Sequence, residues 1–284
     1  MSSFKVTGGT KLRGEIRPQG AKNEVLQILS AVLLSPEEIT VNNIPDIVDV
    51  NKLIELLADL GVQVKKHSPS SYTFKADQVN IEYLLSEEFK IKGGALRGSI
   101  MIVGPLLARF GKGYIPKPGG DKIGRRRLDT HFIGFQRLGA TFVYDRKEHF
   151  YKAEAKKLKG AYMLLDEASV TGTANIIMAA VMAEGLTTIY NAACEPYIQQ
   201  LCKMLNSMGA NIKGVGSNLL QIEGVDYLGG CTHTCLPDMI EIGSFIGLAA
   251  MTASEITIKD VCYDQLGQIP GIFARLGIQM ELRG

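Results

Sequence analysis

The chain alternates between stretches that are apolar all round and stretches that carry apolar residues every three or four positions. The first pattern predicts buried helices, and the second predicts helices that cover an outer face. We expect four helices of each kind. The buried set is predicted at 21–34, 97–110, 171–184 and 242–253, and the striped set at 50–60, 130–138, 197–208 and 266–276.

Each striped helix ends at a similar tripeptide, and these tripeptides recur. Their glycines, Gly61, Gly139, Gly209 and Gly277, lie 78, 70 and 68 residues apart. Glycine at such a place typically ends a helix. Short strands are predicted after each tripeptide and after each buried helix, for example at 38–41, 63–65, 187–190 and 255–258. A period near 70 residues indicates one α/β unit used four times.

Composition narrows the class of protein. With 284 residues, 46% hydrophobic content and a net charge of +2, the chain predicts an ordered globular protein with no nucleic-acid or membrane partner. Its apolar runs are shorter than the roughly 20 residues of a membrane span. The segment Met1–Val6 lacks the pattern of a secretion signal, and the five cysteines show no disulfide framework. We therefore expect reduced thiols and a cytoplasmic protein.

The start of the first buried helix is a candidate anion site. Free backbone N–H groups and the helix dipole favour an anion there, and Lys22, beside Asn23, adds a full positive charge. An ordinary exposed lysine is the alternative.

The loop at 117–131 gathers three glycines, a proline and five cations around Asp121. Such a loop can close over a polyanion. A solvated basic hairpin is the alternative on composition alone.

Two further helix starts carry polar residues. Arg97 begins the second buried helix, and Ser169 precedes the third. Converging helix dipoles suit a diphosphate. Arg97 as a surface charge and Ser169 as a plain N-cap are the alternatives.

The segment Cys231-Thr232-His233-Thr234-Cys235 offers three metal-ligand types. On one extended strand these side chains stand nearly 7 Å apart, so they cannot easily close a tetrahedron. We expect no metal here.

Asp238 and Glu241 either contact substrate or cap the fourth buried helix, and both interpretations stay open.

The repeat, the segment 17–23 and the loop at 117–131 resemble the enolpyruvyl transferase family. The resemblance implies an α/β (α+β) fold of βαβαβ-type units around buried helices, an inside-out α/β barrel. It implies one complete three-unit domain at 22–236, with 1–21 and 237–284 as part of a second. Complete members carry six units, so we expect the C-terminal third to be missing.

The resemblance also implies roles for individual residues. Lys22 and Arg126 meet the phosphate of phosphoenolpyruvate, with Asn23 lying beside it in the substrate site, and Asp121, where many members carry cysteine, donates a proton. Arg97 contacts the sugar nucleotide, whose uridine end is held by Arg126, Arg127, Leu128, Asp129 and Thr130. The turn Glu167, Ala168, Ser169 and Val170 contacts it too, with an acid where some members have lysine. Glu195 is expected behind the groups that touch substrate.

The implied reaction transfers the enolpyruvyl group of phosphoenolpyruvate to the 3'-hydroxyl of UDP-N-acetylglucosamine, releases phosphate, and begins peptidoglycan synthesis. The resemblance implies no cofactor. Two alternatives stay open: a fragment that only binds the sugar nucleotide, and a sister transferase with another acceptor. Shikimate 3-phosphate is disfavoured as the acceptor because the glycine-rich arginine signature of the sister transferases that use it does not appear around Arg97. An RNA-cyclase relative would need a catalytic histidine motif, which the four histidines do not form.

Overall fold

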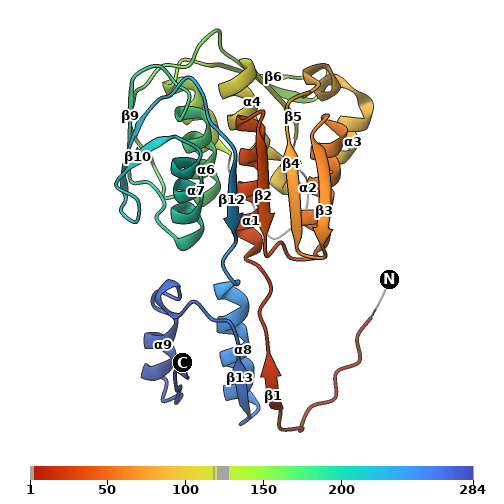
Figure 1. Ribbon diagram of the computed structural model, residues 1–284, viewed down its shortest axis with the longest axis vertical. Coiled ribbons are helices and arrows are strands. Elements are labelled where there is room, and N and C mark those ends of the chain that lie inside the picture. Colours follow the sequence, from red (N-terminus) through yellow and green to blue (C-terminus); the bar gives the residue numbers. More distant parts are fainter. Residues whose placement is uncertain (1–2, 118, 120–127, 284) are drawn as a thin grey trace. The chain divides into compact units, whose positions relative to one another are not determined.

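The computed structural model describes residues 3–117, 119 and 128–283, which divide into two compact units (Figure 1). The larger unit comprises Lys22–Cys235. The smaller unit combines Met1–Ala21 with Leu236–Gly284. The chain therefore crosses between the units at 21/22 and again at 235/236, whereas the sequence placed the second crossing after 236.

Three β-sheets occur among the described residues of the larger unit, one for each predicted repeat. The first has the order β12-β2-β4-β3, the second β5-β7-β6 and the third β10-β11-β9-β8. Their strands are β2 (Glu38–Asn42), β3 (Gln63–Ser68), β4 (Ser71–Lys75), β5 (Lys112–Pro116), β6 (Thr141–Asp145), β7 (Phe150–Glu154), β8 (Tyr162–Leu164), β9 (Leu186–Tyr190), β10 (Asn211–Lys213), β11 (Leu219–Glu223) and β12 (Cys231–Thr234). Strand β12 closes the first sheet by pairing in parallel with β2, a partner early in the chain (Figure 1).

Helices separate into a buried set and an outer set, as the hydrophobic pattern predicts. The buried set contains α1 (Lys22–Ala31), η1 (Val32–Leu34), η3 (Arg97–Ile102), α4 (Val103–Phe110) and α6 (Val170–Ala180). Helix α6 is buried from Gly172 to Ala180, because its side chains are small or apolar on every side. The outer set contains α2 (Val48–Asp59), η2 (Ile81–Leu85), α3 (Glu87–Ala95), α5 (Asp129–Arg137) and α7 (Pro196–Ser207).

The repeated glycines end their helices as predicted. The backbone φ angles of Gly61, Gly139, Gly209 and Gly277 are +94°, +91°, +107° and +82°, a left-handed conformation that glycine adopts without a steric penalty.

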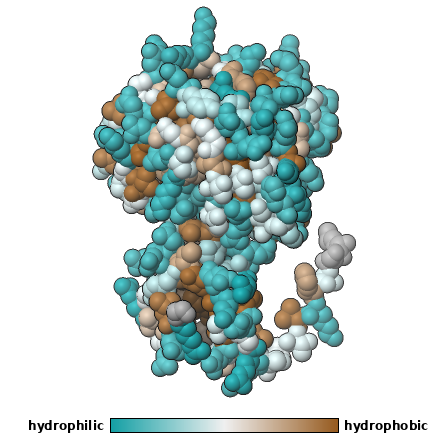
Figure 2. Space-filling model, in the orientation of Figure 1, coloured by the Kyte–Doolittle hydropathy of each residue, from teal (hydrophilic) through white to brown (hydrophobic). Residues whose placement is uncertain are grey.

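The smaller unit holds β1 (Arg13–Ile16) paired in parallel with β13 (Glu255–Ile258). Its helices are α8 (Met239–Met251), η4 (Tyr263–Gln265) and α9 (Ile269–Arg275). Two expectations were wrong here. Helix α8 was predicted to be buried, yet only Ile242 is, because an all-round apolar helix needs neighbours on every side and the described residues supply few. No strand forms within the described residues 278–283, although one was predicted. Apolar side chains of this unit, including Leu248 and Met251, lie at its surface (Figure 2).

No single helix in the described ranges is both long and apolar enough to span a membrane. The pair Glu87–Ala95 and Arg97–Phe110 meets that test only when counted together across a bend of 114°, on length and composition alone.

Candidate functional site

The first turn of α1 presents Lys22 and Asn23. The ammonium of Lys22 forms an ion pair with Asp49, in the first turn of α2, and both side chains are 42% exposed. Asn23 is exposed. An anion that binds at this helix start therefore meets a lysine that already has a carboxylate beside it.

Arg97 begins η3 and is half-buried. The segment just before it anchors the start of the basic loop, because Gly119 donates a backbone hydrogen bond to the Gly94 carbonyl at 2.7 Å. A Cβ added to Gly119 would lie 2.1 Å from that oxygen, so the approach requires glycine. Asp121 follows two residues later in the chain. The described start of the basic loop is thus hydrogen-bonded to the segment just before Arg97.

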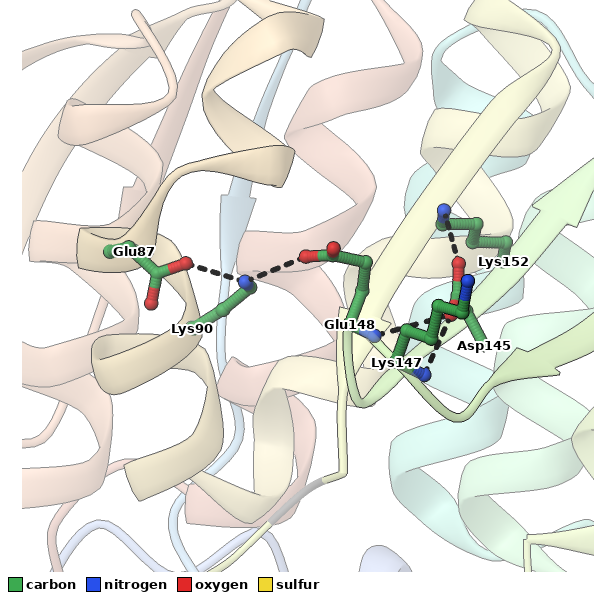
Figure 3. A network of polar contacts seen from close by, with 6 residues as sticks. All are labelled: Glu87, Lys90, Asp145, Lys147, Glu148 and Lys152. Carbon is green, nitrogen blue, oxygen red and sulfur yellow. Dashed lines mark hydrogen bonds and ion pairs between the residues drawn. The ribbon is translucent and has the colours of Figure 1, made fainter.

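One ion pair, Lys90–Glu148, joins α3, the helix before Arg97, to the β6–β7 hairpin, and further polar contacts lie on either side of it (Figure 3). Lys90 pairs with Glu87 at 2.5 Å and with Glu148 at 3.1 Å. On the hairpin, Asp145 accepts hydrogen bonds from Lys152 Nζ at 2.9 Å and from the backbone of Lys147 at 3.0 Å (Figure 3). The Lys90–Glu148 pair therefore links α3 to the sheet whose strand β5 leads into the basic loop.

The starts of α5 and α6 come together. Thr130 donates a hydrogen bond from Oγ1 to Glu167 Oε1 at 3.2 Å. Ser169 caps α6, since its hydroxyl accepts a hydrogen bond from the Gly172 N–H at 3.2 Å. A Cβ on Gly172 would lie 2.6 Å from Thr130 Cγ2, so the two helix starts pack closely. The turn at 167–170 therefore lies in contact with the stretch at 128–130, and its exposed residues Glu167 and Ala168 form the surface there.

A buried polar network lies directly beneath this surface. Asn175, on α6, donates hydrogen bonds from Nδ2 to His131 Nδ1 at 3.0 Å and to the Ile100 carbonyl at 2.8 Å. Its Oδ1 accepts from the Gly104 N–H at 2.7 Å. With Nδ1 accepting, a neutral ring carries its proton on Nε2, which donates to Thr171 Oγ1 at 3.3 Å.

The pKa of His131 also indicates that its ring is neutral. Burial, and secondly the positive charge of Arg97, lowers the pKa of His131 to about 4. The packing of η3 against both α1 and α6 brings the three buried helix starts into one neighbourhood. Gly98, beside Arg97, packs against Leu26 of α1.

Other candidate residues occupy helix starts. Glu195 is the N-cap residue of α7 without a side-chain cap bond, and its Oε2 is buried with no hydrogen-bond partner among the described residues. Asp238 caps α8 by accepting from the Ile240 and Glu241 N–H groups at 2.8 and 3.2 Å. Glu241 accepts from the Gln19 N–H at 2.7 Å. The capping interpretation of Asp238 is therefore correct in this structure.

Three expected site residues, Asp121, Arg126 and Arg127, lie outside the described residues. Sequence reasoning missed the buried pair His131 and Asn175, whose hydrogen bond joins α5 to α6 next to the candidate residues. The signal was available for Asn175, a lone amide within the apolar run of α6, and such a residue needs buried partners.

Comparison with known proteins places these features in a family. The family model described as EPSP synthase (3-phosphoshikimate 1-carboxyvinyltransferase) matches residues 6–281. A UDP-N-acetylglucosamine 1-carboxyvinyltransferase of Bacteroides fragilis strain YCH46 is 66% identical over 284 residues, which is 100% of this chain and 65% of that protein. The protein of the same name in Porphyromonas gingivalis is 63% identical with the same coverage. The chain thus spans 65% of the length of these curated relatives.

Solved structures confirm the expected fold. The enolpyruvyl transferase NikO from Streptomyces tendae superposes with a TM-score of 0.84 at 20% identity, covering 98% of this chain and 65% of that one. EPSP synthase from Acinetobacter baumannii superposes with a TM-score of 0.72 at 17% identity, covering 95% and 60%. On the match to its family model, the chain belongs to the EPSP synthase (3-phosphoshikimate 1-carboxyvinyltransferase) family.

Proposed function

We propose that this chain provides the sugar-nucleotide site, and part of the phosphoenolpyruvate site, of an enolpyruvyl transferase. The acceptor is the 3'-hydroxyl of UDP-N-acetylglucosamine, and the product serves peptidoglycan synthesis. Both substrates are phosphorylated and do not cross membranes unaided, so we place the reaction in the cytoplasm. The 63–66% identity to proteins named for this reaction supports the choice of acceptor.

The observation that carries the proposal is the meeting of the α5 and α6 starts above His131. The exposed Glu167 accepts a hydrogen bond from the buried Thr130, Ser169 caps α6 beside it, and the positive charge of Arg97 lowers the pKa of His131 beneath them. Helix starts offer N–H donors to an anion, and an arginine offers a planar fork of donors to phosphate oxygens. Leu128 to Thr130 hold the uridine end in this arrangement, and Ala168 and Val170 complete the turn beside it.

The chemistry assigned to the chain is a proton transfer and the stabilisation of phosphate. Asp121 protonates the methylene carbon of phosphoenolpyruvate, so that C2 becomes electrophilic and the acceptor hydroxyl adds to it, releasing its proton to solvent. The resulting tetrahedral phospho-ketal then loses phosphate, and one methyl proton returns to the Asp121 carboxylate. Lys22, Asn23 and Arg126 stabilise the phosphate throughout. Glu195 supports the site from behind, and the scheme uses no metal or organic cofactor.

The Lys22–Asp49 ion pair gives this scheme a specific requirement. Phosphoenolpyruvate must draw the ammonium of Lys22 away from the carboxylate of Asp49 or share it. Both groups are 42% exposed, so water screens their attraction and the exchange is inexpensive.

A second candidate function is binding of the sugar nucleotide without turnover, stated of these 284 residues by themselves, which span 65% of the relatives' length. By resemblance, a second acid/base aspartate and the arginines that hold the carboxylate of phosphoenolpyruvate belong to the remaining part. The 284-residue chain then binds UDP-N-acetylglucosamine without turning it over.

Calorimetry with UDP-N-acetylglucosamine, combined with a phosphate-release assay in the presence of phosphoenolpyruvate, separates these functions. We expect binding that Arg97→Ala weakens by at least about tenfold, the loss that about 1.4 kcal/mol of interaction produces. Arg137→Ala is the matched control, because Arg137 is an exposed arginine in the last turn of α5. Binding with phosphate release supports the transferase, and binding without release supports the binding function. Tighter binding of shikimate 3-phosphate than of the sugar nucleotide would contradict both.

A further inference from the structure

Outside the proposed transferase site, the larger unit contains a buried cluster of three metal-ligand types. Glu24 lies in the first turn of α1, His233 lies on β12, and Cys235 directly follows that strand. One ligand atom from each lies within 4.8 Å of the other two. All three residues are buried, with 0%, 9% and 2% of their surface exposed.

The topology explains how residues so distant in sequence meet. Along 231–235 the side chains alternate between the two faces, so His233 and Cys235 point inward while Thr232 and Thr234 are exposed. Helix α1 brings Glu24 against this inward face, where its Oε1 lies 2.9 Å from His233 Nε2. The objection that one strand cannot supply a tetrahedral site does not apply, because the third ligand comes from a helix.

The donor set matches zinc. Thiolate, imidazole and carboxylate are its usual ligands, at about 2.3, 2.0 and 2.1 Å, which places ligand atoms about 3.3–3.8 Å apart in a tetrahedron. The Glu24–His233 pair is closer than that range at 2.9 Å, and every separation in the cluster is at most 4.8 Å, so the three ligand atoms are near enough to share one ion after the side chains adjust. One carboxylate and one thiolate also neutralise a divalent cation in a buried place, where an uncompensated charge is costly.

We propose that Glu24, His233 and Cys235 form a Zn²⁺ site whose fourth ligand is water. The ion ties the first turn of α1 to β12, the strand that closes the first sheet. Because Glu24 follows Lys22 and Asn23 directly, the ion fixes the helix start that presents them, although the site does not depend on the proposed transferase function.

The competing account is a metal-free cluster of hydrogen bonds. In that state burial, and secondly Glu24, raises the pKa of Cys235 well above its usual range, so the thiol is protonated and donates to Glu24. His233 then completes the cluster with its own bond to Glu24. The two accounts differ in whether a metal enters and releases the thiol proton to solvent.

The test uses the 284-residue chain, stripped with a chelator and titrated with Zn²⁺ or with Co²⁺ as an optical probe. We expect one equivalent of metal, a thiolate-to-cobalt charge-transfer band, and a rise in Tm that the chelator reverses. Zinc X-ray absorption should show one sulfur at about 2.3 Å and the remaining ligands at about 2.0–2.2 Å.

Variants identify the ligands. Cys235→Ser should abolish the charge-transfer band, and Glu24→Gln should weaken binding at least about 100-fold, beyond the 10–100-fold typical when only a hydrogen-bonded neighbour of a ligand is lost. Cys231→Ser, at the start of β12, is the matched control and should leave both the band and the affinity unchanged. A wild-type chain without the band, an X-ray spectrum without sulfur, or a band that survives in folded Cys235→Ser would overturn the proposal.

Discussion

Asn175 donates a hydrogen bond to Nδ1 of His131 at 3.0 Å, and this bond fixes which ring nitrogen carries the proton. An acceptor nitrogen cannot be protonated, so the buried ring is neutral. Asn175 also bonds the backbone at Ile100 and Gly104. One amide therefore joins α5, α6 and the segment η3–α4 beneath the proposed nucleotide surface.

Stability should fall as pH falls because of His131. Its pKa is about 4 in the folded protein against 6.5 when unfolded, so the unfolded chain binds more protons between these values. The stability that the neutral ring contributes is fully present above pH 6.5 and is lost as pH falls toward 4, on the order of 3 kcal/mol in total. Urea denaturation across pH 4–7.5 measures it. His131→Gln should flatten that part of the profile, and an unchanged slope would rule out this source.

Asn175→Ala should be strongly destabilising. It leaves the Gly104 N–H, the Ile100 carbonyl and His131 Nδ1 buried without their partner, at about 1–3 kcal/mol for each group. We expect a loss of at least about 3 kcal/mol in chemical denaturation. Asn206→Ala is the control, because Asn206 is exposed and water can replace its bonds to Ile212. Equal losses in the two variants would contradict the network.

Gly119→Ala should impair substrate binding more than stability. The added Cβ would lie 2.1 Å from the Gly94 carbonyl oxygen, so the start of the basic loop must move away from the turn that carries Arg97. We expect weaker binding of phosphoenolpyruvate with a Tm close to that of the wild type. Gly271→Ala, which meets nothing within 4 Å, is the control. A large fall in Tm without a binding defect would assign Gly119 to the fold alone.

Glu167→Gln should tighten the binding of UDP-N-acetylglucosamine. Glu167 places a negative charge at the turn proposed to face the diphosphate, and glutamine keeps an acceptor for the Thr130 hydroxyl. The side chain is exposed, so the gain should be a few-fold, up to about fivefold, and should shrink with added salt. Calorimetry at two salt concentrations measures it, with Glu223→Gln, an exposed carboxylate on β11, as the control. Weaker binding in Glu167→Gln would place the diphosphate elsewhere.

The sequence predicted three features of the fold, because each follows from local spacing. They are the repeat, the division into buried and outer helices, and the four glycines that end the outer helices. The exposure of α8 could not be predicted, since burial depends on the neighbours of a helix rather than on the helix itself. Sequence also separated Glu24 from His233 by 209 residues, and no local pattern indicates that they meet. The same holds for Asn175 and His131, whose contact depends on how α5 packs against α6.

The parallel pairing of β12 with β2 carries a consequence for synthesis. Thr234 pairs with Asn42, 192 positions earlier, so the first sheet lacks its edge strand while those positions are translated. At roughly 5–20 residues per second this interval lasts about 10–40 s. During this interval the edge of β2 that pairs with β12 is unpaired, and Glu24 at the start of α1 lacks its partner His233. Ribosome pausing before residue 235 should therefore prolong exposure to chaperones and proteases.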